Sequence, residues 1–290
     1  MSQAQPITKP TLPKNESGEL NTNSIAPRRF RISYEDASHI PKHWVENNGF
    51  LTHWLNAYTL TIPGGEDFNV RTIRSYIDEI SDEELKSTAQ GFVAQELSHG
   101  KAHEKFFDVL NHHGFNSKIF LSLYNFISFK ILEPLSTKLS KLAFVVAIER
   151  INEIIGEVNL ESGILNDSPR SAALLYEWHF AEEIEHKSVA YDIYQNVSGN
   201  RFMLAYSTTI CYLVNMMFLV LGAVSFSIQD GSILNPKNWL RGFRYFFTKE
   251  KFFWRVTWAC IELNFKKFHP SQSNNLHLAK AILNSRDIQV

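Results

Sequence analysis

Apolar residues recur between positions 85 and 110 in alternating steps of four and three, the spacing that places side chains on one face of an α-helix. Eight positions make up this face: Leu85, Ala89, Phe92, Glu96, His99, His103, Phe106 and Leu110. The pattern calls for apolar side chains throughout, yet its three central positions hold Glu96, His99 and His103. Burying an unpaired carboxylate is costly, so this polar centre needs a partner inside the protein.

Local signals bound this helix and predict another before it. Ser81 and Asp82 supply a cap at its start, and Gly114 ends it. The preceding helix is predicted over residues 66–80, with Glu66 on its apolar face. A short aromatic-rich helix comes earlier and ends in a turn at the Pro-Gly-Gly sequence of residues 63–65.

Two later helices repeat the same irregularity. The third is predicted over residues 135–162, after an apolar connection at 117–134. Its apolar face includes two acids, Glu149 and Glu153. In the fourth, Ser168 caps the start, Pro169 occupies the first turn, and the end falls near residue 197. The polar positions on the face of this fourth helix are His179, Glu182 or Glu183, and His186.

The periodicity predicts an all-α protein, with a ferritin-like four-helix bundle and extra C-terminal helices. No segment alternates convincingly with the period of two that a strand requires. We expect three parts: a disordered tail at 1–27, a helical bundle at 28–200, and an apolar helix with basic aromatic helices at 201–290. The tail is polar, contains four prolines and lacks the apolar run of a signal peptide.

The polar positions of the four helices form a ligand set for two metal ions. The set consists of Glu66, Glu96, His99, Glu149, Glu183 and His186. Glu96 with His99, and Glu183 with His186, each form a Glu-x-x-His pair, and the three-residue spacing places both side chains of a pair on the same helix face. Glu66 precedes Glu96 by 30 residues and Glu149 precedes Glu183 by 34, so two similar helix pairs follow one another. Four carboxylates and two imidazoles are the ligands of di-iron and di-manganese bundles. Iron is favoured, and manganese or zinc also fit.

Some assignments stay open at this level. Glu153 competes with Glu149, and Glu182 competes with Glu183, because each reaches the same helix face. His103 and His179 lie one turn from the predicted ligands. They are therefore either additional ligands or partners that orient the ligands. The alternative for the whole cluster is a set of buried ion pairs and hydrogen-bonded core histidines without metal.

Composition and charge limit the partners and the compartment. The chain has 29 basic and 30 acidic residues and no recognisable nucleic-acid-binding module, so we expect no nucleic-acid partner. Cys211 and Cys260 are the only cysteines, which fits a reducing compartment. We expect the protein in the cytoplasm or on the inner membrane facing the cytoplasm. Its oligomeric state is open.

The C-terminal third suggests contact with a membrane. Residues 202–229 contain no charged side chain and are long enough to span a bilayer, although a buried bundle helix fits equally well. Residues 239–259 then interleave aromatic with basic side chains, and the wider stretch 237–268 holds eight Lys or Arg against two Glu. The sequence therefore predicts either a membrane surface element or span, or helices that pack over the bundle.

Four blocks of the sequence carry a family resemblance: "PRRFRISYEDASHIPKHW", "IPGGEDFNVRTIRSY", "FVAQELSHGKAHEKF" and "WHFAEEIEHKSVAYDIY". Together they resemble the bacterial family of predicted metal-dependent hydrolases, from about residue 27 onward. The resemblance implies a metal-dependent enzyme, and it carries the family pattern onto Glu66, Glu96, His99, His103, Glu149, His179, Glu182, Glu183 and His186. Where we expect Glu followed by His on the third helix, this chain has Glu149 followed by Arg150.

Three functional hypotheses follow. The ligand set favours a di-iron enzyme that oxidises a lipophilic small molecule with dioxygen. The family resemblance favours a metal-dependent hydrolase in which a dinuclear site activates water. The third hypothesis is a metal-free, membrane-associated helical scaffold. The sequence identifies no catalytic residue beyond the metal ligands and no organic cofactor.

Overall fold

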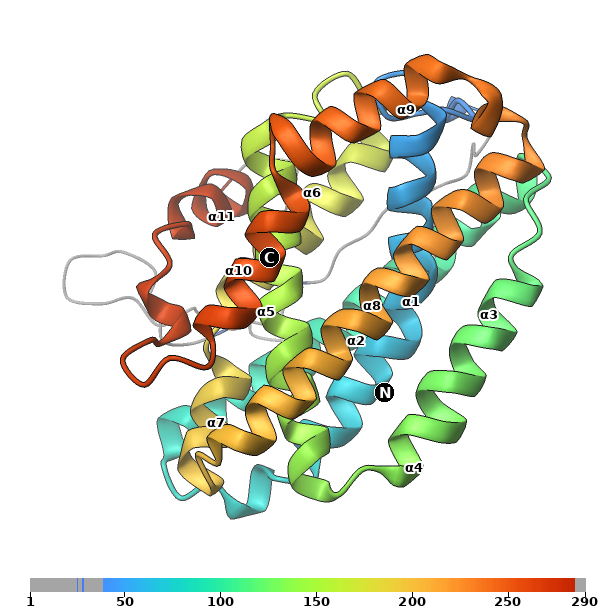
Figure 1. Ribbon diagram of the computed structural model, residues 1–290. Helices are drawn as coiled ribbons and strands as arrows, with labels where there is room; N and C mark the ends of the chain where they lie inside the picture. The colour runs from blue at the N-terminus through green and yellow to red at the C-terminus, as the bar shows by residue number, and fades with distance from the viewer. Residues whose placement is uncertain (1–24, 26–27, 29–38, 285–290) are drawn as a thin grey trace, which may run out of the picture.

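The computed structural model describes residues 25, 28 and 39–284, and these residues form helices without any β-strand (Figure 1). The predicted all-α class is therefore confirmed for the described chain. The predicted N-terminal tail lies outside the described residues apart from Ile25. The α-helices are α1 (Gly49–Arg74), α2 (Glu83–His112), α3 (Lys118–Asn125), α4 (Glu133–Leu135), α5 (Lys138–Ser162), α6 (Arg170–His186), α7 (Val189–Val197), α8 (Arg201–Gln229), α9 (Pro236–Phe243), α10 (Phe252–Glu262) and α11 (Leu276–Leu283).

The limits of α2 agree with the capping signals. The Asp82 side chain accepts hydrogen bonds from the backbone amides of Glu84 and Leu85, at 2.9 and 3.0 Å. Gly114 follows the helix with φ +76°, a conformation that glycine adopts without the clash of a Cβ atom. Helix α5 also matches its prediction to within a few residues. It begins after Thr137, whose hydroxyl accepts from the Ser140 amide.

The predicted turn at residues 63–65 is wrong, because α1 continues through it as one helix. The two glycines admit neighbouring aromatic rings instead of reversing the chain. A Cβ atom on Gly64 would lie 2.8 Å from the Phe129 ring, and one on Gly65 would lie 3.7 Å from the Tyr124 hydroxyl. Packing in the folded protein thus outweighs the local preference for a break. The helix ends at Arg74 rather than near residue 80.

Three other boundaries differ from the predictions. The connection at 117–134 is helical, with a π-helical stretch Phe126–Leu132 between α3 and α4. The predicted fourth helix is divided into α6 and α7 around Lys187, whose ammonium group binds the Ser273 carbonyl and the Asn275 side chain. Ser168 does not cap α6, because Pro169 occupies the position before the helix and no side chain caps it.

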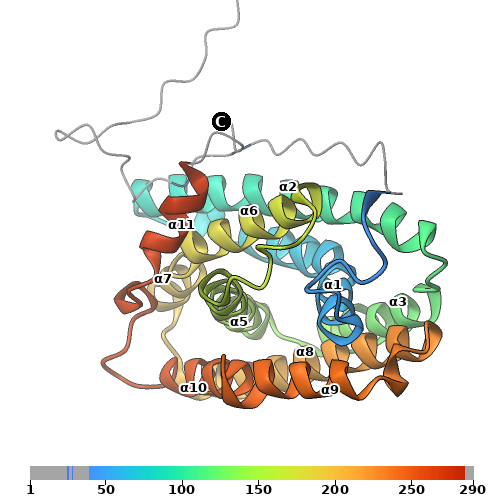
Figure 2. The same cartoon turned by 90° about the horizontal axis from the view of Figure 1, so that it is seen from above.

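The helices are arranged in layers that place α1 and α5 in the middle (Figure 2). Helices α2 and α6 cover one side of this pair, and α8, α9 and α10 cover the other. The interior between α1, α2, α5 and α6 therefore receives side chains from all four helices that the sequence singled out. Whether the chain divides into a bundle at 28–200 and an appended part at 201–290 stays a prediction.

Helix α8 is the one helix in the described part of the chain that is long and apolar enough to cross a bilayer. Its inner side packs on α1 and α5. Gly222 permits a close approach there, because a Cβ atom on it would lie 2.5 Å from the Ala57 side chain. Only 39% of its most apolar 18-residue window is buried in the protein.

Asp230, directly after α8, forms hydrogen bonds with His53 on α1 and with His43 in the segment before α1; we name this set of contacts the clasp. Asp230 Oδ2 lies 2.6 Å from His43 Nε2 and 2.9 Å from His53 Nε2. Asn56 donates to His53 Nδ1, because its amide oxygen is already the acceptor for the Trp44 indole. His53 therefore carries its proton on Nε2 and donates it to Asp230.

Candidate metal centre

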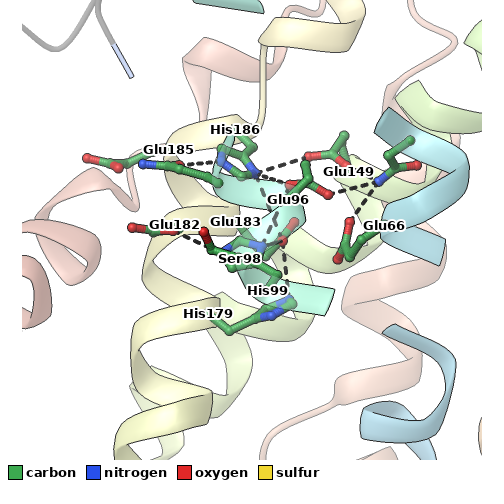
Figure 3. A network of polar contacts seen from close by, with 12 residues as sticks. Glu66, Glu96, Ser98, His99, Glu149, His179, Glu182, Glu183, Glu185 and His186 are labelled. Atoms are coloured by element: carbon green, nitrogen blue, oxygen red, sulfur yellow. Dashed lines mark hydrogen bonds and ion pairs between the residues drawn. The ribbon is translucent and has the colours of Figure 1, made fainter. Parts of the chain in front are cut away.

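Nine acidic and histidine side chains from four helices converge in the interior. Each is at most 2% exposed: Glu66, Glu96, His99, His103, Glu149, His179, Glu182, Glu183 and His186. Glu66 comes from α1 and Glu149 from α5, while α2 and α6 each contribute a Glu-x-x-His pair and further histidines (Figure 3). The helical spacing read from the sequence thus places these residues together, as expected.

Glu183 lies at the middle of the group. Its Oε1 atom is 3.3 Å from His99 Nδ1 and 3.2 Å from His179 Nε2. His186 Nδ1 approaches from the other side, 3.9 Å from the same oxygen and 2.8 Å from Glu96 Oε1. Nitrogen and oxygen ligand atoms from α2 and α6 therefore surround one small volume.

Many of these polar atoms have no hydrogen-bond partner among the described residues. The unpartnered atoms around this volume are Glu96 Oε1, His99 Nδ1, Glu149 Oε2, both carboxylate oxygens of Glu183, His186 Nδ1 and Asn69 Oδ1. Leaving one such group unpaired in a protein interior costs about 1–3 kcal/mol, and more when it is charged. Some of these seven atoms make close ion-pair contacts, such as Glu96 Oε1 with His186 Nδ1 at 2.8 Å, but none has a hydrogen bond of normal geometry, so the group still lacks a partner that satisfies it. A bound cation satisfies carboxylate oxygens and imidazole lone pairs together, so the residues fit a metal.

The geometry defines two overlapping ligand groups. The first consists of Glu66, His99, His179 and Glu183, and the second of Glu96, His99, Glu183 and His186. In each group, one ligand atom from every residue lies within 4.8 Å of the others. Glu149 belongs to neither group, although its Oε2 atom is 3.7 Å from His186 Nδ1. His179, which the sequence left open, is thus as close to the centre as the predicted ligands.

Two further contacts orient the histidines. Glu182 Oε2 lies 2.9 Å from His99 Nε2, and Gln95 Oε1 lies 2.6 Å from His186 Nε2. Because a carboxylate only accepts, His99 Nε2 must be the donor, and Gln95 Oε1 accepts from His186 in the same way. Both histidines then direct Nδ1 toward the centre. Such a second contact on the far nitrogen is typical of metal-binding histidines.

Three of the open positions have partners that hold them away from the centre. Glu182 binds His99 and also accepts from Arg28 at 3.1 Å. Glu153 pairs with Arg150 at 2.5 Å and accepts from Asn275 at 2.9 Å. His103 lies one step outside, with Nδ1 3.1 Å from the Thr59 hydroxyl and Nε2 3.1 Å from His179 Nδ1. The geometry therefore favours Glu149 and Glu183 over Glu153 and Glu182, while the ligand assignment itself stays a prediction.

Asn69 is a residue that the sequence analysis missed. Its amide nitrogen lies 3.2 Å from Glu66 Oε2, 3.3 Å from Glu96 Oε2 and 2.9 Å from Glu149 Oε1. It is completely buried. The signal was present in the sequence, because Asn69 follows Glu66 by three residues and so shares its helix face. Gln95 was also missed, although it precedes His99 by four residues and so lies near the same helix face. Arg28 was missed because no spacing rule connects it to the site.

Burial and crowding shift the pKa values of the centre in opposite directions. Burial, and next the nearby Glu183 carboxylate, raise the pKa of Glu149 well above its usual range and also raise that of Glu96. Burial alone would raise the pKa of Glu183, but His179 and His99 beside it lower it well below the usual value. For His99, the carboxylates of Glu182 and Glu183 outweigh burial and raise its pKa to about 10.

Two other histidines, His179 and His103, stay neutral. Burial, with the positive charge of His99 nearby, lowers the pKa of His179 to about 4. Burial, followed by neighbouring His179 and His99, holds the pKa of His103 well below its usual value. Without a metal, the centre thus keeps a proton on His99 between carboxylates. With a metal, that proton must leave, because a ligand nitrogen needs its lone pair.

Comparison with known proteins supports metal dependence. The family model described as "Predicted metal-dependent hydrolase" matches residues 26–274, which include every residue of the centre. No curated protein and no solved structure matches the chain. The match covers most of the sequence and agrees with the resemblance noted in its four blocks. The chain belongs to the family of predicted metal-dependent hydrolases.

Proposed function

We propose that this protein is a metal-dependent hydrolase whose centre holds two metal ions. The observation that carries the proposal is the set of unpartnered, buried oxygen and nitrogen atoms contributed by α1, α2, α5 and α6. The two overlapping ligand groups would hold two neighbouring ions, with Glu183 common to both groups and His99 Nδ1 available to one ion. The family description favours hydrolysis over the oxidation reaction that the ligand set alone suggested.

A cavity beside the centre would admit water and substrate. It lies between α1, α2 and α3, has a volume of about 410 Å³, and is lined by Glu66 and Glu96 at the centre. Asp67, Lys101 and Glu104 also line it. These charged side chains, set among apolar ones such as Leu97 and Phe107, suit a substrate that carries a polar group to the metal. Bound metals would lower the pKa of a water molecule and polarise the group to be cleaved.

The chain's own residues hold the centre in shape. Asn69 spaces the carboxylates of Glu66, Glu96 and Glu149, and it donates to all three. Glu182 and Gln95 keep the Nε2 protons of His99 and His186 on the outer side.

A second cavity supports a partly lipophilic substrate. It has a volume of about 90 Å³ and lies between α1, α5, α8 and the π-helical stretch. Its lining is mainly apolar and includes Phe68, Phe129 and Phe144. Two other lining residues, Gly65 and Ile148, directly precede Glu66 and Glu149 in the chain. An alkyl group in this cavity would therefore lie beside the helices that carry the centre.

Oxidation of a lipophilic molecule by a di-iron centre is the second candidate. The donor set favours it, because four carboxylates with a Glu-x-x-His pair on each of two helices are typical of oxygen-activating bundles. Iron is then the expected metal, whereas manganese or zinc suits the hydrolase equally well.

Metal content and two activity assays separate these candidates. The metals per chain are measured by elemental analysis for the wild type, for Glu96→Ala combined with His186→Ala, and for Glu84→Gln as a control on the exposed side of α2. Each sample is then tested for hydrolysis of nitrophenyl esters and phosphodiesters. The same samples loaded with ferrous iron are exposed to oxygen, and oxygen consumption and any new absorption band are measured.

Two ions per wild-type chain, absent from the double variant, with metal-dependent hydrolysis would support the proposal. Oxygen-dependent absorption without hydrolysis would replace it with the di-iron oxidase. A folded wild type that takes up no metal would overturn both and leave a helical scaffold with buried ion pairs.

A further inference from the structure

The layer formed by α8, α9 and α10 has an outer side that no described part of the chain covers. Figure 2 shows this layer opposite α2 and α6. Its inner side packs on α1 and α5, so its outer side points away from the metal centre. We name this outer side the aromatic face. Its most characteristic exposed side chains are Phe202, Leu213, Leu240, Phe243, Trp254 and Trp258.

Helix α8 is apolar on both sides. Phe202, Tyr206, Leu213 and Met217 point outward at helical spacing and are 81, 53, 59 and 40% exposed. A surface helix of a soluble protein normally carries charged or polar side chains on this side. A continuous exposed apolar surface instead marks a site that binds another apolar surface.

Helices α9 and α10 extend this surface with aromatic rings. Trp254 and Trp258 are 62 and 54% exposed. The Trp258 indole N–H donates to Glu262 Oε1 at 2.7 Å, so its polar atom is satisfied while its ring stays accessible. On α9, Trp239 donates to the Ile233 carbonyl in the same way at 2.6 Å. Tryptophan rings of this kind are enriched at the level of lipid headgroups.

Uncompensated positive charge accompanies the aromatic rings. Lys237, Arg244 and Lys251 are exposed, and none of them forms an ion pair with another described residue. The two acids of this region, Glu250 and Glu262, already pair with other basic side chains. Glu250 lies 3.4 Å from Arg241, and Glu262 lies 3.0 Å from Arg150.

We infer that the aromatic face docks on the surface of an anionic lipid bilayer. Exposed aromatic rings with basic side chains beside them suit the interface between acyl chains and anionic headgroups. A second copy of the chain fits less well, because a symmetric contact would place the unpaired cations of both copies against each other. This inference does not depend on the proposed reaction.

The packing of α8 determines how the protein lies on the bilayer. Leu204, Phe218 and Phe226 on its inner side are at most 1% exposed and belong to the protein core. Helix α8 cannot cross a membrane alone without abandoning these contacts. It therefore lies in the plane of the interface, with the metal centre on the side of the protein away from the lipid.

Vesicle co-sedimentation of the full chain tests the inference. The probes are vesicles of phosphatidylcholine alone and of phosphatidylcholine mixed equally with phosphatidylglycerol. One variant removes charge (Lys237→Gln, Arg244→Gln and Lys251→Gln), and another removes rings (Trp254→Ser and Trp258→Ser). Lys86→Gln with Lys105→Gln on α2, which removes two positive charges on the opposite side, serves as the control. Thermal unfolding verifies that each variant is folded, and ultracentrifugation without lipid gives the oligomeric state.

Wild type and the α2 control are expected to bind the anionic vesicles, and added salt should weaken the binding. Each cation removed should weaken it roughly fivefold, so the charge variant should bind about a hundredfold more weakly. The ring variant should bind both kinds of vesicle less, and brominated lipid should quench wild-type tryptophan fluorescence more than that of the ring variant. A wild type that stays in solution with anionic vesicles overturns the inference. So does a dimer that the ring variant dissociates, because the aromatic face would then be a contact between two copies.

Discussion

Glu182 and Glu183 are neighbours in the chain with opposite surroundings. Both oxygens of Glu182 are hydrogen-bonded, at 3.1 Å to Arg28 and 2.9 Å to His99. Neither oxygen of Glu183 has a hydrogen bond of normal geometry to a described residue, and its Oε1 makes ion-pair contacts with His179 and His99 at 3.2 and 3.3 Å. A helix rotates by about 100° per residue, so adjacent side chains point in different directions. One of the two carboxylates therefore orients a ligand, and the other faces the centre.

This difference predicts unequal effects of two matched substitutions. Glu183→Gln should abolish binding of at least one metal ion, because a neutral amide replaces the shared carboxylate. Glu182→Gln should weaken metal affinity only about 10- to 100-fold, since it removes the charge behind His99 and no direct ligand. Metal titration of the chelator-treated protein measures both. Equal losses in the two variants would contradict this division of roles.

Asn69 should matter most when no metal is bound. Its amide is a shared donor for three carboxylates, so Asn69→Ala should destabilise the chelator-treated protein by about 1–3 kcal/mol. With metal present the loss should be smaller, because the cation then satisfies the same oxygens. Urea unfolding in the two conditions measures the difference, with the exposed Asn111→Ala as the control. A loss of the same size with and without metal would indicate that no cation takes over this role.

Gly156 permits the close contact between α5 and α6 that brings Glu149 toward Glu183. A Cβ atom there would lie 2.8 Å from the Phe180 carbonyl oxygen. Gly156→Ala should therefore lower the free energy of unfolding by about 1–3 kcal/mol through overpacking. Gly100→Ala on α2 is the matched control, since its nearest neighbour would be 3.7 Å away. That control should be neutral or stabilising by up to about 1 kcal/mol, because alanine favours a helix. Urea unfolding distinguishes the two outcomes.

The clasp at Asp230 predicts a loss of stability in acid. Burial, opposed in part by Asp230, lowers the pKa of His53 from 6.5 to about 4. The unfolded chain therefore binds more protons than the folded protein between these values. Above pH 6.5, His53 is neutral in both states and the free energy of unfolding is unaffected by its titration. As the pH falls toward 4, protonation of His53 in the unfolded chain lowers the free energy of unfolding by an amount that reaches about 3 kcal/mol, converted from the pKa shift.

Unfolding free energies of wild type and His53→Gln, measured across that window, test the prediction. The advantage of the wild type should shrink as the pH falls, whereas exposed His112→Gln should follow the wild type throughout. Parallel curves for wild type and His53→Gln would show that His53 titrates normally in the folded protein. Asp230 acts in the same direction at lower pH, because the Ser232 and histidine donors outweigh burial and lower its pKa.

The sequence by itself determined the helical class and most of the centre. Regular spacing of three and four residues decides which side chains share a helix face, and this rule is local. For this reason the sequence alone groups Glu66, Glu96, His99, Glu149, Glu183 and His186. Capping by Asp82 and the glycine at 114 are local as well, and both were confirmed.

Only the tertiary structure decided the remaining questions, because each depends on a partner distant in the chain. Glu153 turns away from the centre because Arg150 and Asn275 bind it, and Asn275 lies 122 residues further along. Helix α1 continues through Pro63, and Gly64 then lies against the ring of Phe129, 65 residues further along. His179 reaches Glu183, and Asn69 reaches three carboxylates, because four helices meet at one point. Local periodicity gives the direction of a side chain, and only packing gives what it meets.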